Sequence, residues 1–226
     1  MKKDIFNNYR VKLIIFLCTI FLFTLFAEFL RFTKPLFNKI YYGYLTPMII
    51  DLLRIIIYFI IFFLSTNYAK KNLKPVEYTK IKDISTKRIA ILYGITILTI
   101  FIVTAILGFR LKLVVDLGEN IGMIYLYNNL AKILAGVVRM LISFLIIRYT
   151  EELFKDILNT KILKYLPAGG IISMLTIGLF EFIITPKKAF IDVLFMLFHI
   201  LYGYIYKLSY NNKAICLTIM MFIRLL

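Results

Sequence analysis

The sequence predicts an all-α, polytopic membrane protein with six to eight transmembrane helices and a cytoplasmic N-terminus. Three observations lead to this prediction. The 226-residue chain is 62% hydrophobic, whereas typical soluble domains are roughly 45–50% apolar. Its formal net charge is nevertheless +16, from 28 Lys and Arg against 12 Asp and Glu. Because the apolar residues form long runs and the cations lie mainly between them, an ordinary soluble enzyme and a nucleic-acid-binding protein are both excluded.

Each predicted span follows from a run of apolar residues. A hydrocarbon layer about 30 Å thick requires roughly 20 such residues in a helix. Six runs meet or approach that length, and a short apolar tail is a candidate for a seventh span. They cover residues 13–30, 46–66, 89–109, a stretch ending near 147, 168–185 and 190–206, with the tail at 214–226. The N-terminus resembles a signal peptide, but no small-residue cleavage site follows its long apolar run, so we expect a retained first span.

The fourth run has two interpretations. Residues 122–147 are long for a single crossing and include several polar side chains. Alternatively, an interfacial piece over 122–133 precedes a separate buried helix from 134 to about 158. The second interpretation places the 148–152 segment inside the membrane instead of at its edge.

The distribution of Lys and Arg predicts the orientation of the chain. Basic residues are concentrated in the N-terminal tail, in the loop 67–88 and after residue 147, while the alternate loops carry fewer. Loops rich in Lys and Arg stay on the cytoplasmic side of a membrane. We therefore expect a cytoplasmic N-terminus, with the loop 67–88 lying against anionic lipid.

Cysteine and histidine usage limits the possible chemistry. Cys18 and Cys216 lie in apolar runs nearly the whole chain apart, which favours two buried thiols over a disulfide. With one histidine, His199, a zinc site with several His or Cys ligands is not expected. No cofactor is firmly implied, although glutamates and one histidine could hold a divalent ion.

Ionisable side chains within apolar runs are the candidates for function, because each costs roughly 2.5–3.5 kcal/mol to insert into a membrane. Some have structural explanations. Asp51 and Arg54 are three residues apart and can pair on one helix. Glu28 can reach the lipid headgroups, and Arg224 is close enough to the C-terminus to reach water. The other members of this set are Lys132, Arg139, the 148–152 stretch, Glu181, Asp192 and His199.

Four of these residues are candidates for catalysis: Glu151, Glu152, Glu181 and His199. Adjacent carboxylates in a low-dielectric site repel each other, so one of the glutamate pair is expected to retain a proton. Such a pair suits general acid–base work on a water molecule. His199, near the middle of its run, and Glu181 could help to position that water for attack on a peptide carbonyl.

A structural explanation of the same residues stays open. Arg148 and Lys155 can neutralise the glutamate pair at a helix end, and Arg148 lies four residues before Glu152, the spacing of a helical ion pair. A lone histidine in a span is also often a hydrogen-bonded packing residue.

The local sequence resembles the CAAX protease and bacteriocin-processing family. In residues 141–158 an apolar helix runs into a glutamate pair, as in the first motif of that family, and residues 203–209 resemble its Gly-x-x-Tyr stretch. This chain departs from the pattern in three places. Asp156 stands where the family has arginine, Ile184 where its second motif ends in histidine, and no histidine occurs near residue 218.

The related PrsW-type intramembrane proteases offer a second alignment. Their glutamate pair is followed three residues later by lysine, as in residues 151–155, and their next glutamate follows a Gly/Phe-rich stretch, as in residues 177–181. Their histidine with glycine four residues later resembles His199 and Gly203. Ile177 and Phe182 depart from the phenylalanine and asparagine of that family, and its distal histidine motif is missing.

We expect a single integral-membrane domain over 1–226, with N-terminal helices over 1–133 that match the family only as generic spans. The resemblance covers roughly residues 141–226 and implies a protease-like core over 134–226. It implies a glutamate-dependent intramembrane endopeptidase of a bacterial-type cytoplasmic membrane, with Glu151 or Glu152 as general base supported by Glu181 and His199. The expected partners are membrane lipids and a membrane-embedded peptide or protein.

Two other functions remain open. Because the motifs are incomplete, a non-catalytic descendant ranks almost level with the protease: an immunity factor, a scaffold or an accessory subunit of an exporter. The third possibility is a small transporter or substrate-capture subunit. Against that possibility, the sequence contains no duplicated half of the kind common in transporters.

Overall fold

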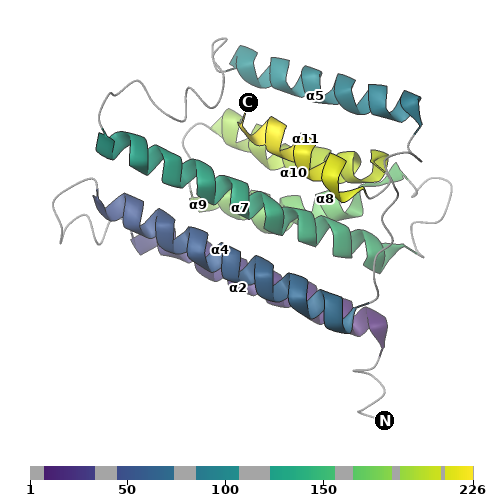
Figure 1. Ribbon diagram of the computed structural model, residues 1–226, viewed down its shortest axis with the longest axis horizontal. Coiled ribbons are helices and arrows are strands. Elements are labelled where there is room, and N and C mark those ends of the chain that lie inside the picture. Colours follow the sequence, from purple (N-terminus) through teal and green to yellow (C-terminus); the bar gives the residue numbers. More distant parts are fainter. Residues whose placement is uncertain are drawn as a thin grey trace.

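The computed structural model describes residues 8–33, 45–73, 85–106, 123–155, 165–184, 189–209 and 212–225, and within these ranges it contains helices and no strands. Most helices run along one common direction, the long axis of the molecule (Figure 1). In chain order they are α2 (Tyr9–Phe29), the short 3₁₀ helix η1 (Leu30–Thr33), α4 (Leu45–Asn72), α5 (Thr86–Ile106), α7 (Met123–Phe154), α8 (Ala168–Ser173), the π-helical segment η4 (Met174–Gly178), α9 (Leu179–Ile184), α10 (Ala189–Leu208) and α11 (Lys213–Leu225). The all-α prediction is confirmed for this part of the chain.

Within the part of the chain that the structure describes, four helices are long and apolar enough to cross a membrane. They are Tyr9–Phe29, Ile49–Asn72, Thr86–Ile106 and Asn129–Phe154, and they correspond to the first four predicted spans. The C-terminal helix α11 has 13 residues and is about 20 Å long at 1.5 Å per residue. This described length is less than the thickness of a hydrocarbon layer, about 30 Å.

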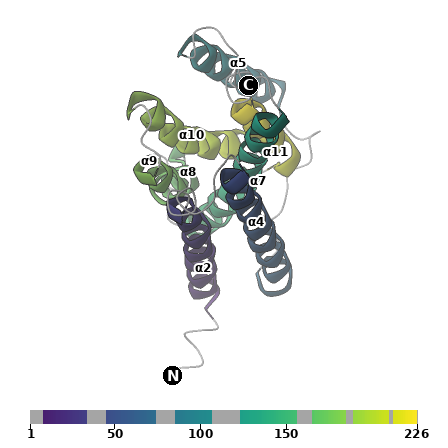
Figure 2. The same cartoon turned by 90° about the vertical axis from the view of Figure 1, so that its left-hand side faces the viewer.

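Helix α7 is the central helix of the bundle. It packs against α2 and α4 on one side and against α8, α10 and α11 on the other (Figure 2). In its most apolar stretch 71% of the residues are buried inside the protein, compared with 22% in α5, which contacts mainly α10 and α11. Helix α7 runs without a break from Met123 to Phe154, so the helix of the second interpretation begins before residue 134.

Local sequence explains how individual helices begin and how their polar groups are satisfied. The side chain of Asn8 accepts a hydrogen bond from the backbone N–H of Arg10 at 3.0 Å and caps the start of α2. The hydroxyl groups of Thr24 and Thr96 donate to the carbonyls four residues earlier, each at 2.7 Å. These bonds allow buried threonines in apolar helices without leaving a polar group unsatisfied.

Small residues bring α8 very close to its two neighbours. A Cβ atom added to Gly169 would lie 2.4 Å from the backbone oxygen of Ile147 in α7. One added to Gly203 in α10 would lie 2.7 Å from the Cα atom of Gly170. Glycines at such crossings allow backbones to approach closely, as is common between membrane helices. These two crossings determine where the side chains of the predicted site can lie.

Candidate functional site

Glu151 joins α7, α8 and α10 at one end of the segment 134–226. It lies in α7 one turn after Ile147, whose backbone touches Gly169, so its carboxylate reaches the start of α8. Oε1 accepts a hydrogen bond from the backbone N–H of Gly169 at 2.9 Å, and Oε2 lies 3.1 Å from Nζ of Lys207 in α10. The preceding Pro167 makes no side-chain cap to α8, so Glu151 supplies the cap from a neighbouring helix. A carboxylate is favourable there because the helix N-terminus is electropositive.

Glu152 has a different environment, although it is the next residue. Consecutive side chains on a helix point about 100° apart. Glu152 Oε2 lies 4.0 Å from Nζ of Lys155, whose side chain is 73% exposed. From the sequence, Lys155 and Arg148 are candidates to neutralise the glutamate pair. In the structure, Lys155 pairs with Glu152 and Lys207 pairs with Glu151.

His199 is buried in α10 and is held by a neighbouring hydroxyl group. Its Nδ1 lies 2.9 Å from Oγ of Ser173, at the end of α8. Its ring meets that of Tyr202 edge to face, with the ring centres 5.9 Å apart. A Cβ atom added to Gly178 would lie 2.9 Å from Cδ2 of His199, so the π-helical segment that ends at Gly178 leaves room for the imidazole. Segments of π-helix occur often at functional sites.

A small pocket lies beside His199 between α7, α10 and α11. Its volume is about 20 Å³, which is enough for about one water-sized molecule. The pocket is too small for a peptide segment. The residues that line it are Gly136, Arg139, Met140, Ser143, Phe198, His199, Tyr202 and Arg224.

The predicted catalytic residues do not form one site among the side chains that the structure describes. Both oxygens of Glu151 contact Gly169 and Lys207, Glu152 contacts Lys155, and neither carboxylate bonds to His199. Glu181 belongs to α9, but its side chain lies outside what the structure describes, as do those of Lys132 and Asp192. In the described part of the chain no group of three or more His, Cys, Asp and Glu residues is arranged to hold a metal ion.

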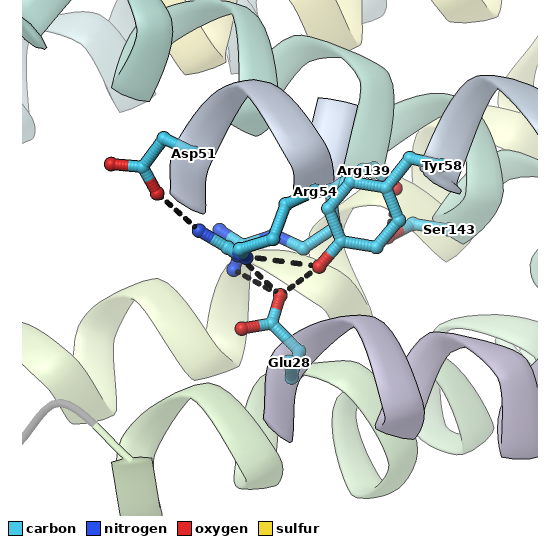
Figure 3. Close-up of polar contacts among 6 residues, drawn as sticks. All are labelled: Glu28, Asp51, Arg54, Tyr58, Arg139 and Ser143. Atoms are coloured by element: carbon cyan, nitrogen blue, oxygen red, sulfur yellow. Dashed lines mark hydrogen bonds and ion pairs between the residues drawn. The ribbon is translucent and has the colours of Figure 1, made fainter. Parts of the chain in front are cut away.

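A second polar cluster, which we call the ion cluster, lies between α2, α4 and α7 (Figure 3). It contains two carboxylates, two guanidinium groups and a phenol, all of them buried: Glu28, Asp51, Arg54, Tyr58 and Arg139. The carboxylate of Glu28 is at its centre. Oε1 of Glu28 lies 2.8 Å from Nη2 of Arg54 and 3.3 Å from Nη1 of Arg139, and it accepts a hydrogen bond from the hydroxyl group of Tyr58.

Two sequence interpretations are tested by the ion cluster. The expected pairing of Asp51 with Arg54 is confirmed, with Oδ1 and Nη1 2.8 Å apart. The expectation that Glu28 extends to the headgroups is wrong, because Glu28 is only 2% exposed and pairs with Arg54 and Arg139. Glu28 can be buried because the two guanidinium groups balance the negative charge of its carboxylate.

The position of Glu28 on α2 carries a signal for this burial. The buried residues Phe16, Ile20 and Thr24 recur every four residues, and Glu28 is the next in that series. On α4, Arg54 and Tyr58 follow the buried Ile50 at the same interval. Once those buried residues are known from the structure, the four-residue spacing places Glu28 and Arg54 on the inner faces of their helices.

Arg139 connects the ion cluster to the pocket beside His199. It pairs with Glu28 on one side and lines the pocket on the other. Arg224 enters the same pocket from α11, and its guanidinium group lies over Gly136, where an added Cβ atom would be 2.9 Å from Nη2. A series of polar side chains therefore crosses the bundle from Asp51 to His199.

Comparison of the chain with protein-family models, with curated proteins and with solved structures finds no match. The class of the protein rests on its architecture alone. The described residues form a helical bundle with charged residues in its interior, and four of their helices are long and apolar enough to cross a membrane.

Proposed function

We propose that this protein is a non-catalytic scaffold of the membrane that binds a membrane-embedded peptide or protein. The observation that carries the proposal is the environment of Glu151. Both of its oxygens already have partners, the N–H of Gly169 at 2.9 Å and Nζ of Lys207 at 3.1 Å. A general base needs an oxygen directed at the reacting water. Glu151 is therefore better suited to holding α7, α8 and α10 together than to activating water.

Two further observations support a binding function over hydrolysis. The pocket beside His199 has a volume of about 20 Å³, so a peptide bond has no room to enter there. In the resemblance to the CAAX family, Asp156 and Ile184 replace residues of the family motifs. In the resemblance to the PrsW-type proteases, Ile177 and Phe182 do so. We propose a shared architecture over 134–226 in a chain that has lost cleavage.

Proteolysis is the second candidate function, and one observation favours it. Glu151 and His199 contact the same helix at Gly169 and Ser173, positions one turn and about 6 Å apart along its axis. If the side chain of Lys207 moved away from Glu151, Oε2 of Glu151 would be available to bind a water molecule on that side of α8. In this candidate Glu151 or Glu152 is the base, with His199 and Glu181 as supporting groups.

The proposed orientation has a cytoplasmic N-terminus and six to eight spans in a bacterial-type cytoplasmic membrane. It rests on the excess of Lys and Arg in the tail and in the loop 67–88. Single cysteines placed in that loop and in the loop after Ile106, in a Cys18→Ser, Cys216→Ser background, test it. A membrane-impermeant maleimide applied to intact cells should label the second loop and spare the first, and the reverse pattern would contradict the orientation.

Cleavage of membrane-spanning peptides by the purified protein in phosphatidylcholine vesicles tests the function itself. We expect no products above the peptide-alone control from the wild type, Glu151→Gln or Glu152→Gln. We also expect Glu151→Gln to unfold at a lower temperature than Glu152→Gln, since only Glu151 connects helices. Products that the wild type forms, and that Glu152→Gln fails to form at equal stability, would overturn the scaffold and support the protease.

A further inference from the structure

A groove runs along the outer side of the bundle between α2 and α4, the two helices that splay apart below α7 in Figure 2. Its volume is about 510 Å³, and the described residues that line it all belong to these two helices. Buried residues form its floor, and half-exposed apolar residues form its walls. The floor consists of Phe16, Ile20, Ile61 and Ser65, and the walls include Ile15, Phe23, Phe26, Ile60, Leu64 and Tyr68.

Two lysines lie in register with this groove at one of its ends. The two helices are antiparallel, since Phe16 stacks on Tyr68 with ring centres 5.7 Å apart while Glu28 pairs with Arg54. Lys12 precedes Ile15 and Phe16 by three and four residues, so it continues the groove face of α2. Lys71 follows Tyr68 by three residues and continues the groove face of α4. Neither lysine forms an ion pair with the described residues.

The length of the groove matches one leaflet of a bilayer. Ile15 and Phe26, its limits on α2, are about 17 Å apart along the axis at 1.5 Å per residue. Half of a hydrocarbon layer about 30 Å thick is about 15 Å. The groove is therefore about as long as the acyl region of one leaflet.

We propose that this groove binds an acyl chain of an anionic phospholipid, whose phosphate group lies between Lys12 and Lys71. The apolar walls take the place of neighbouring lipid chains, and the two ammonium groups attract the headgroup. Basic pockets between membrane helices on the cytoplasmic side select anionic headgroups in this way. In the proposed orientation these lysines face the cytoplasm, so the lipid belongs to the inner leaflet.

Retention of lipid by the purified full-length protein tests this site. The protein, washed in neutral detergent, is incubated with equal amounts of phosphatidylglycerol and phosphatidylcholine, and the bound lipid is measured by mass spectrometry. We expect the wild type to retain more phosphatidylglycerol than phosphatidylcholine. Lys12→Gln and Lys71→Gln should each reduce this enrichment about fivefold, because one basic residue near an anionic surface contributes that much. Lys70→Gln is the matched control, since it removes the same charge from the same helix one position off the groove face.

Two other variants distinguish a lipid bound in the groove from other possible occupants of the groove. Thr19→Trp fills the groove with an exposed side chain, and it should abolish retention of both lipids without changing the unfolding temperature in detergent. Equal retention in Lys70→Gln and Lys71→Gln, or retention unchanged in Thr19→Trp, would overturn the proposal. Disulfide-linked dimers of Thr19→Cys, in a Cys18→Ser background in phosphatidylglycerol vesicles, would overturn it in favour of a second copy of the chain.

Discussion

Nη2 of Arg54 lies 2.8 Å from Oε1 of Glu28, and this ion pair joins α4 to α2 inside the protein. The two residues are 26 positions apart in sequence and both are almost completely buried. Arg139 reaches the same oxygen from α7 at 3.3 Å. One carboxylate therefore connects α2, α4 and α7, so its removal should loosen all three.

Glu28→Gln should destabilise the protein strongly. Glutamine removes the negative charge that balances Arg54 and Arg139, and breaking a buried ion pair by removing one partner typically costs about 3–5 kcal/mol. Glu152→Gln is the control, because its partner Lys155 is exposed and such pairs contribute about 0–1 kcal/mol. Thermal unfolding in detergent compares the two variants. Equal unfolding temperatures for both would contradict a structural role for the ion cluster.

The crossing of α8 and α10 gives a second prediction. A Cβ atom in Gly203→Ala would lie 2.7 Å from the backbone of Gly170, so the helices must separate. Overpacking of this kind typically costs about 1–3 kcal/mol. Gly94→Ala is the matched control in α5, where nothing lies within 4 Å of the added atom. Its stability should be unchanged or raised by about 0.5–1 kcal/mol, the usual gain of alanine in a helix. An equal loss in both variants would show that the crossing is not close.

Gly136→Ala should have a milder effect than Gly203→Ala. The atoms nearest to its added Cβ are the guanidinium group of Arg224, with Nη2 at 2.9 Å. A flexible side chain can move away at little cost, whereas the backbone at Gly203 cannot. We expect the unfolding temperature to fall by less than half of the change in Gly203→Ala. Thermal unfolding in detergent checks the order, and a larger fall in Gly136→Ala would mean that Arg224 is fixed in place.

The sequence predicts the helices well but not their inner faces. The apolar runs locate α2, α4 and α5 because length and hydrophobicity are properties of single segments. Which face is buried is harder to predict, because lipid-facing residues are as apolar as core residues and the usual periodicity is lost. Leu22 and Phe23 are exposed while Ile20 is buried, although all three are apolar.

The pairing of charged residues shows the same limit. Asp51 and Arg54 could be paired from their spacing on one helix, and the structure confirms this pair. The partners of Glu28 and Glu151 lie on other helices, so spacing alone could not identify them. The glutamate pair resembled a catalytic motif because the residue types match, whereas the directions of the two side chains depend on how α7 packs against α8.

The most direct test of the account is a double-mutant cycle between Glu151 and Lys207, measured as free energy of unfolding in mixed micelles. If Glu151 holds α8 and α10 to α7, Glu151→Gln and Lys207→Gln should each destabilise the protein, and the double variant should be less destabilised than their sum. The pair is partly exposed, at 11% and 21%, so we expect a coupling energy of about 1–2 kcal/mol, between the values for surface and buried pairs. Additive losses, together with peptide cleavage that Glu151→Gln abolishes, would contradict the account and make Glu151 a catalytic residue.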